Sequence, residues 1–114
     1  MDNCLFCKII KGDIPANKVY ENEHILAFRD IDPKAAVHIL VIPKKHIKSI
    51  NDLKSSDKYL AGELILASKK IAKDQGIDSR GFRTIFNTND DGGQTVYHIH
   101  MHIMGGRQMT WPPG

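Results

Sequence analysis

Long hydrophobic runs are missing from this sequence of 114 residues. No stretch approaches the roughly 18 apolar residues that a membrane-spanning helix requires, and residues 1–10 lack the apolar segment of a secretory signal peptide. We therefore expect a cytoplasmic protein without a membrane partner. A large excess of charge of one sign is missing too, because 16 lysines and arginines face 13 aspartates and glutamates. The resulting net charge of +3, spread over scattered residues, does not predict a nucleic-acid partner.

Cysteine is almost absent, since Cys4 and Cys7 are the only two in the chain. In a reducing cytosol they are not expected to form a structural disulfide, and a chain of this length can bury a core without one. Their spacing is that of half a zinc site. A redox dithiol is disfavoured because no strand is predicted before the pair. Two reduced cysteines on a short helix are the third interpretation.

Repeats, low-complexity segments and internal linkers are also lacking, so residues 1–114 are expected to form a single domain. Periodicity and turn residues predict two helices and five strands. The expected helices cover residues 4–11 and 57–76, and the expected strands cover residues 18–20, 24–30, 38–42, 82–87 and 96–104. Asn3 is expected to cap the short helix, and Ser55 or Ser56 the long one. Short links between strands favour an α+β fold with an antiparallel five-stranded sheet, packed by the long helix on one face.

The sequence does contain a row of alternating histidines near its end, namely His98, His100 and His102. In an extended strand alternate side chains share a face, so three imidazoles are predicted on one side of the sheet, spaced by about 6.5 Å. The opposite face is filled by the intervening apolar residues, Ile99, Met101 and Ile103. Imidazole can act as nucleophile, acid, base or metal ligand near neutral pH, so this row predicts a functional site.

Three interpretations of the row are open. The histidines could be structural, they could bind a catalytic metal, or His100 could attack an electrophile with its neighbours holding its tautomer. The preceding loop favours the third. It contains Gly92 and Gly93, whose backbone N–H groups are expected to form an anion-binding concavity, followed by the hydroxyl of Thr95. An anion bound there would lie beside the imidazoles, which suits a phosphate.

The histidine row and several other segments resemble the histidine triad superfamily, and within it the nucleotide-binding branch. The matching segments run nearly from end to end: FRDIDP at 28–33, HILVIPKKH at 38–46, Asn87, GGQTVY at 92–97, HIHMHIM at 98–104, GGRQM at 105–109 and WPPG at 111–114. The tail from residue 105 is specific to this branch. The resemblance implies a HIT-like fold and a homodimer in which residues 105–114, with Trp111, reach the partner's active site.

The resemblance implies a purine nucleoside phosphoramidase that hydrolyses AMP–amine conjugates and related aminoacyl-adenylates. His100 would attack the α-phosphorus and release the amine, and water would then hydrolyse the nucleotidyl-histidine to give AMP. No cofactor is implied for this chemistry. A dinucleoside polyphosphate hydrolase and a non-catalytic nucleotide-binding regulator are the alternatives.

Further roles carry over by the same resemblance. His102 would bind a phosphate oxygen, His38 would orient the triad, and His98 or Thr95 would protonate the leaving amine. The implied nucleotide contacts are Asp30 to the ribose hydroxyls, Ile31 to the base, and Asn87, Gly93, Gln94 and Thr95 to ribose and phosphate. Thr95 stands where serine is common in this branch, and Thr110 stands where many animal members carry histidine.

Some bacterial members that resemble this chain bind zinc through two cysteines, the histidine of the PKKH segment and the first triad histidine. The corresponding residues here are Cys4, Cys7, His46 and His98. Two cysteines and two histidines are an ordinary ligand set for structural zinc. The cysteine pair, which animal members lack, points to the bacterial type, and a bound zinc would brace the histidine strand.

Overall fold

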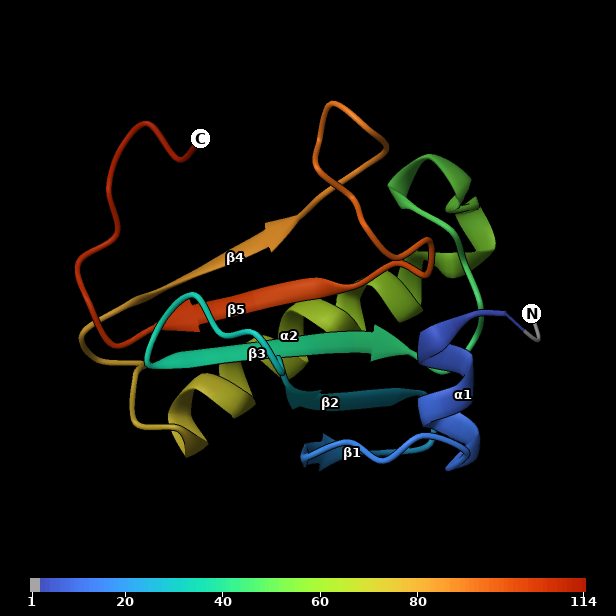
Figure 1. Ribbon diagram of the computed structural model, residues 1–114, viewed down its shortest axis with the longest axis horizontal. Coiled ribbons are helices and arrows are strands. Elements are labelled where there is room, and N and C mark those ends of the chain that lie inside the picture. The colour runs from blue at the N-terminus through green and yellow to red at the C-terminus, as the bar shows by residue number, and fades with distance from the viewer. Residues whose placement is uncertain (1–2) are drawn as a thin grey trace.

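The computed structural model describes residues 3–114, which form one antiparallel sheet with a helix on either side (Figure 1). In chain order the elements are α1 (Leu5–Lys11), β1 (Lys18–Glu21), β2 (Ile25–Arg29), β3 (Val37–Pro43), α2 (Lys58–Asp74), β4 (Phe82–Phe86) and β5 (Met101–Gly105). The five strands lie in the order β1-β2-β3-β5-β4, and every neighbouring pair is antiparallel. The predicted α+β fold is therefore confirmed.

The short helix α1 begins one residue later than predicted. Cys4, rather than Asn3, is its N-cap residue, because the Cys4 Sγ accepts a hydrogen bond from the Cys7 backbone N–H at 3.3 Å. Gly12 ends the helix in the left-handed conformation, with φ of 86°, which glycine adopts without steric cost. The cysteine pair thus lies at the start of a helix only seven residues long.

The long helix α2 is preceded by two 3-10 turns, Ile50–Asp52 and Ser55–Asp57. The prediction that Ser55 or Ser56 caps the helix is wrong, since Asp57 is the N-cap residue. The Asp57 carboxylate instead accepts a hydrogen bond from the Lys54 backbone N–H at 2.9 Å, which closes the preceding turn. No helix among residues 3–114 is both long and apolar enough to span a bilayer.

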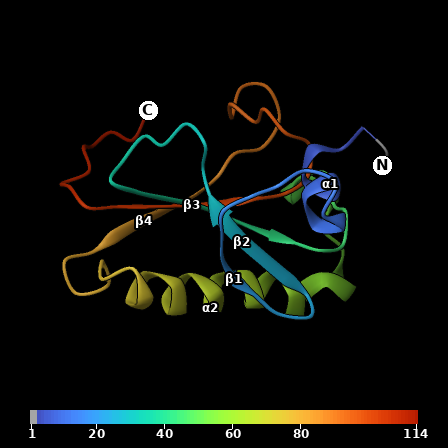
Figure 2. The same ribbon diagram turned by 60° about the horizontal axis from the view of Figure 1, so that its bottom comes forward.

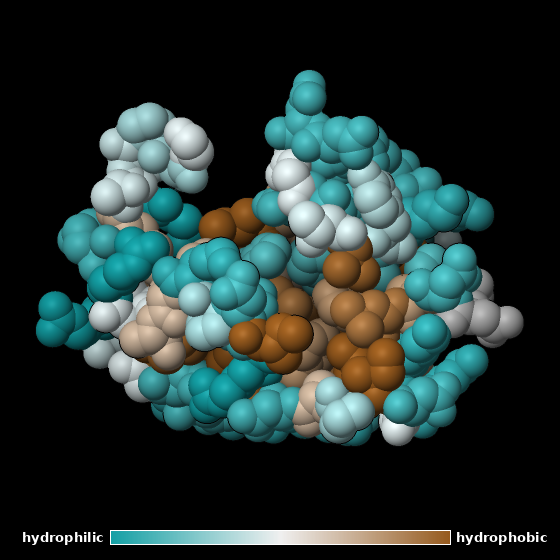
Figure 3. All heavy atoms as spheres, viewed as in Figure 1, coloured by the Kyte–Doolittle hydropathy of each residue, from teal (hydrophilic) through white to brown (hydrophobic). Residues whose placement is uncertain are grey.

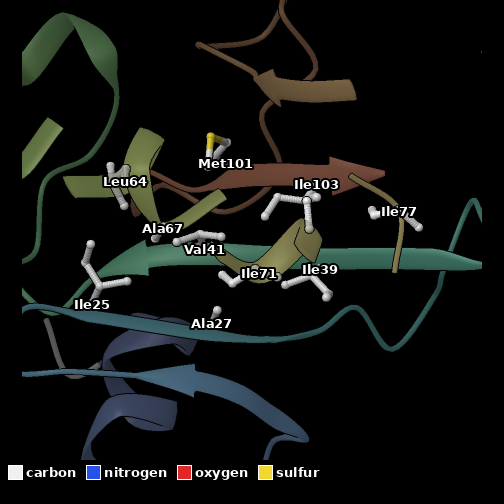
Figure 4. Packing of buried hydrophobic residues seen from close by; sticks show 11 residues of the cluster. Ile25, Ala27, Ile39, Val41, Leu64, Ala67, Ile71, Ile77, Met101 and Ile103 are labelled. Atoms are coloured by element: carbon white, nitrogen blue, oxygen red, sulfur yellow. The ribbon is translucent and has the colours of Figure 1, made fainter. Parts of the chain in front are cut away.

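One face of the sheet packs against α2 (Figures 2 and 4). The buried residues of this cluster come from β2, β3, β5, α2 and the segment after α2: Ile25, Ala27, Ile39, Val41, Leu64, Ala67, Ile71, Ala72, Ile77, Met101 and Ile103. The apolar stripe predicted on α2 is confirmed at Leu64, Ala67 and Ile71, whereas Leu60 is only half-buried. Because alternate residues of a strand face opposite sides, burying Ile39 and Ile103 here turns their neighbours to the other face.

The second face carries α1 and a smaller apolar cluster. Its buried members are Phe6, Ile9, Leu26, Phe28, Leu40 and Ile42. Phe6 of α1 lies edge-on to Phe28 of β2, with ring centroids 5.5 Å apart. This face is where His38 and His102 emerge, in strands β3 and β5.

The last strand is shorter than predicted, because β5 begins at Met101 and not at residue 96. The sheet register ends at Met101, which pairs with Val41 on one side and Phe86 on the other. The residues before Met101 leave the sheet and approach the segment that follows β3. There the Ile99 backbone N–H donates to the Ile47 carbonyl at 2.6 Å. His98 and His100 therefore lie in an irregular segment that leads into the strand from outside the sheet, and only His102 belongs to the strand.

Replacement of Ile71 by alanine should lower the free energy of unfolding by about 2–5 kcal/mol, because its side chain is 1% exposed and the cavity left behind cannot be filled by water. Lys69→Ala, at an exposed position of the same helix, should change it by less than about 0.5 kcal/mol. Urea denaturation at equal protein concentration checks both. Equal effects of the two substitutions would contradict the assignment of Ile71 to the core.

Candidate active site and metal centre

A hollow of about 250 Å³ opens beside α1 on the second face of the sheet, and we call it the α1-side hollow. Figure 3, in the view of Figure 1, shows hydrophobic side chains gathered on this face near α1. Its lining residues come from α1, the linker that follows, β2, β3 and the segment leading into β5: Leu5, Phe6, Ile9, Ile14, Pro15, Ala16, Phe28, Arg29, Asp30, Ile31, Leu40, Thr95, Val96, His100 and His102. One wall is apolar and the other carries two imidazoles and a carboxylate.

The hollow brings together only part of the predicted nucleotide-binding set. Five of those residues line it: Asp30, Ile31, Thr95, His100 and His102. Asn87, Gly93, Gln94 and Trp111 are not among its lining residues within this chain. The apolar wall was missed by the sequence analysis, because side chains such as Phe6, Ile9 and Phe28 follow a pattern that equally predicts core.

Larger hollows lie elsewhere on the described residues. One of about 560 Å³ lies beyond the end of α2 and is lined by three arginines, Arg80, Arg83 and Arg107. It contains no histidine, carboxylate, serine, threonine or cysteine, so it offers no nucleophile or general base. The α1-side hollow is smaller, but it is lined by two histidines of the row, His100 and His102, together with Asp30 and Thr95.

His100 is held in a defined tautomer by the backbone. Its Nδ1 lies 2.9 Å from the His98 carbonyl oxygen, and a carbonyl can only accept, so Nδ1 carries the proton. The neutral ring therefore keeps its lone pair on Nε2. Burial lowers the pKa of His100 below its ordinary value of 6.5, which favours this neutral form. Phe6 supports the ring edge-on, with centroids 5.1 Å apart.

His102 is held in the opposite tautomer through His38. The Lys34 backbone N–H donates to the His38 Nδ1 at 3.0 Å, so a neutral His38 carries its proton on Nε2. That Nε2 lies 2.9 Å from the His102 Nδ1, which must then accept, leaving a proton on the His102 Nε2. Burial lowers the pKa of His38, and burial lowers that of His102 to about 4, so both rings are neutral near pH 7. His100 thus offers a lone pair at Nε2, and the neighbouring His102 offers an N–H at Nε2.

Asp30 lies between the hollow and this chain of histidines. One carboxylate oxygen accepts a hydrogen bond from the Asp32 backbone N–H at 2.9 Å, which is the turn-capping role that its position before Asp32-Pro33 suggests. The other oxygen lies 3.4 Å from the His38 Nε2. Ile31, the next residue, is 99% exposed, so its side chain forms part of the open rim of the hollow.

The loop before the histidines is closed by its own hydrogen bonds. Gln94 donates from Nε2 to the carbonyls of Lys48 and Val96, and its Oε1 accepts from the Asn89 backbone N–H. The Gly93 backbone N–H is not free to bind an anion as expected, because it donates to the Asp90 carbonyl, and the Gln94 backbone N–H donates to the Asn89 carbonyl within the loop. The Asn87 side chain also donates to the Gly93 carbonyl, at 3.4 Å. These residues shape the loop that presents Thr95.

A glycine is required at position 92, because a Cβ there would clash with the Thr88 carbonyl oxygen. Gly93 follows with φ of 77°, a backbone conformation that side chains rarely adopt. The paired glycines therefore serve the tight turn of the loop.

Two cysteines and two histidines converge beside α1, and we call them the Cys/His centre: Cys4, Cys7, His46 and His98. The His98 Nδ1 lies 3.1 Å from the His46 Nδ1, 3.4 Å from the Cys4 Sγ and 3.6 Å from the Cys7 Sγ. The Cys7 Sγ lies 3.4 Å from the His46 Nδ1. Around a tetrahedral zinc the corresponding separations would be about 3.3 Å between nitrogens and about 3.5 Å between nitrogen and sulfur.

The donor chemistry of the Cys/His centre also fits a metal. The fully buried His98 ring donates from Nε2 to the Pro43 carbonyl at 2.8 Å, which leaves the Nδ1 lone pair directed into the centre. A backbone carbonyl that fixes the second nitrogen of a histidine ligand is the usual arrangement around bound metals. The four residues therefore form a set that could hold a metal ion.

A metal bound by all three triad histidines does not fit the geometry. Among residues 3–114, His98 groups with the cysteines, whereas His102 groups with Asp30 and His38, whose ligand atoms also lie within 4.8 Å of one another. In that second set the His38 and His102 nitrogens already share a hydrogen bond. The histidine row is thus divided between a Cys/His centre and the wall of the α1-side hollow.

The C-terminal tail lies at the other end of the sheet from α1 (Figure 1), and none of its residues lines the α1-side hollow. The Arg83 guanidinium donates to the Thr110 carbonyl at 2.9 Å, which fixes the tail beside β4. The Trp111 side chain is 82% exposed.

Comparison with known proteins gives a consistent result. The model of the HIT domain family matches residues 11–109. A HIT-like protein of Synechococcus elongatus is 49% identical over 99% of this chain and 98% of its own. The crystal structure of a HIT family hydrolase from Legionella pneumophila has a TM-score of 0.96 and 56% identity, covering 98% of this chain and 100% of that one. A histidine triad nucleotide-binding protein from Candida albicans has a TM-score of 0.82 and 33% identity, covering 96% and 83%.

The hydrogen bonds predict three fixed tautomers that nitrogen-15 NMR of the histidine rings can detect. At pH 7, His100 should carry its proton on Nδ1 and His102 on Nε2, and metal-free His98 should carry it on Nε2. Because burial lowers the pKa of His102 to about 4, its ring should stay neutral as the pH falls from 7 to 5.5. Protonation of His102 at or above pH 6.5, or the same tautomer at His100 and His102, would contradict the arrangement.

Proposed function

Because the chain belongs to the HIT domain family, we propose that it is a hydrolase of purine nucleoside phosphoramidates, acting on AMP joined through a P–N bond to an amine and on related aminoacyl-adenylates. The observation that carries this proposal is the His100 ring, whose Nδ1–H is bound by the His98 carbonyl, leaving the Nε2 lone pair as the reactive atom of a residue that lines the α1-side hollow. A relative described as a HIT family hydrolase supports the proposed hydrolysis. A relative described as a histidine triad nucleotide-binding protein supports a nucleotide as the ligand.

The reaction proceeds in two displacements. The His100 Nε2 attacks the α-phosphorus, a new P–N bond forms, and the old P–N bond breaks as the amine leaves with one proton. Water then attacks the same phosphorus, the bond to His100 breaks, and AMP is released. A neutral imidazole is a good nucleophile and, once protonated, a good leaving group, so the same residue suits both steps.

The His102 Nε2–H is suited to donate a hydrogen bond to a phosphate oxygen, because His38 holds its other nitrogen as an acceptor. Such a donor stabilises the charge that builds up on the phosphate in each displacement. His38 acts here as a positioning residue, and the Lys34 backbone N–H sets its tautomer.

Of Thr95 and His98, Thr95 is the better candidate for protonating the leaving amine. It lines the hollow, whereas the His98 ring is fully buried with its Nε2–H bound to the Pro43 carbonyl. A general acid has to come within hydrogen-bond reach of the departing nitrogen, which favours the exposed hydroxyl.

The rest of the hollow suits a nucleoside. The apolar wall around Phe6, Ile9 and Phe28 offers a dry surface for a purine, with Ile31 at the rim. Asp30 stands at the polar end, where its carboxylate can accept hydrogen bonds from the ribose hydroxyls. Asn87, Gly93 and Gln94 contribute by shaping the loop that carries Thr95.

The resemblance in the tail also supports a homodimer. In that assembly Trp111, which lies away from its own hollow, would complete the nucleotide site of the partner. Residues 105–114 would then be the tail of a single domain that spans residues 1–114, and they would form part of the partner's nucleotide site.

Turnover of an AMP–amine conjugate tests the proposal. His100→Ala should lower kcat by at least about 10³-fold, because the nucleophile is lost, while AMP still binds. His24→Ala, an exposed histidine outside the hollow, should leave kcat unchanged. Rapid acid-free quenching and mass spectrometry should find a nucleotidyl group on His100 in the wild type.

Two other outcomes favour the alternatives. Faster cleavage of a diadenosine polyphosphate than of the AMP–amine conjugate would identify a dinucleoside polyphosphate hydrolase. AMP binding without turnover of either compound by the wild type would identify a non-catalytic nucleotide-binding regulator.

We further propose that the Cys/His centre holds a structural zinc ion through two thiolates and two imidazoles. Bound there, the ion would act by cross-linking the chain, and the displacement at phosphorus would need no metal. Burial raises the pKa of the Cys7 thiol, so metal binding has to release its proton.

Purified protein should contain about one zinc per chain by elemental analysis, and Cys4→Ser should lower that content and the melting temperature. The matched control is the wild type treated with a chelator and then reloaded with zinc, which should recover its melting temperature. A zinc content near zero after growth in zinc-supplied medium would contradict the assignment.

A further inference from the structure

We propose that Cys4, Cys7 and His46 are positioning residues for the α1-side hollow, so that metal in the Cys/His centre and nucleotide in the hollow strengthen each other's binding. This inference rests on the proposed nucleotide site and on the proposed metal. None of the three residues lines the hollow, so the coupling has to pass through their neighbours.

The first connection runs through His98, which belongs to both sites by different atoms. Its ring Nδ1 faces the Cys/His centre, and its backbone carbonyl accepts the hydrogen bond from the His100 Nδ1–H at 2.9 Å. A displacement of His98 therefore moves the group that fixes the tautomer and direction of His100.

The second connection runs through α1. Cys4 caps this helix and Cys7 lies in it, while Leu5, Phe6 and Ile9 form part of the wall of the hollow. Phe6 lies edge-on to both rings, with centroids 5.9 Å from His98 and 5.1 Å from His100. A helix of seven residues is too short to be stable by itself, so its position depends on such anchors.

The third connection is the segment after β3. His46 is followed by Ile47, whose carbonyl accepts the hydrogen bond from the Ile99 backbone N–H at 2.6 Å. The Cys/His centre thus joins three segments that the strand pairing does not join: the start of α1, residues 46–47 and residues 98–99.

Ordering these segments costs conformational entropy. A ligand that orders them makes the binding of a second ligand less costly, which produces positive coupling without any large change of shape. Such couplings are typically about 5- to 150-fold in affinity, and linkage requires the same factor in both directions.

Reciprocal binding measurements test the coupling. AMP binding is measured by calorimetry with zinc-loaded protein and with protein stripped by a chelator, and zinc affinity is measured by competition with a colorimetric chelator with and without AMP. We expect AMP to bind at least about 5-fold more weakly to the stripped protein, and zinc to bind more tightly with AMP by that same factor. If zinc only stabilised the fold, its affinity would be the same with and without AMP.

Hydrogen exchange localises the effect. Backbone N–H groups of residues 5–11 should exchange more slowly with zinc alone and with AMP alone than in the unliganded protein. His46→Asn should weaken AMP binding as stripping does, whereas His24→Asn, an exposed histidine outside both sites, should not. If His46→Asn fails to fold, the stripped wild type gives the same comparison.

Each failure has its own signature. Equal AMP affinity with and without zinc overturns the coupling alone. Absence of AMP binding in both forms overturns the nucleotide site and the coupling with it, and absence of zinc binding overturns the metal assignment and the coupling with it.

Discussion

The hydrogen bond from the His100 Nδ1–H to the His98 carbonyl is the contact on which the proposed chemistry depends. It removes the ambiguity between the two nitrogens of the imidazole and leaves the lone pair on the second nitrogen. Burial lowers the pKa of the ring and keeps it neutral near pH 7. Neighbouring His102 is fixed in the opposite sense by His38 and the Lys34 backbone N–H. Backbone groups, rather than charged side chains, thus distinguish two chemically identical rings.

This arrangement is possible because the two faces of the sheet are covered differently. The face toward α2 is filled with aliphatic side chains and supplies most of the buried core. The other face is covered by the short helix α1 only in part, so imidazoles and a carboxylate remain at the edge of an apolar hollow. Because α1 is short, its position has to be fixed by other contacts. The Cys/His centre lies where α1 begins and can supply them.

Most of the fold follows from local sequence patterns. The apolar runs of β2 and β3 and the apolar stripe on α2 are properties of short windows, and apart from β5 the predicted elements agree with the structure to within a few residues. The largest error occurs where a distant group decides the outcome, since β5 begins at Met101 because the Ile99 backbone N–H bonds to the Ile47 carbonyl.

The sequence by itself determined the α+β class, the alternation of three histidines and a cysteine pair with the spacing of metal ligands. The resemblance to the histidine triad family added the grouping of Cys4 and Cys7 with His46 and His98. Only the tertiary structure decided that the histidine row is divided between two sites, which tautomer each ring adopts, and that apolar residues of α1 form a wall of the hollow. The physical reason is that hydrogen bonds and burial at these sites join residues far apart in the chain, such as Cys4 and His98, which no local pattern contains.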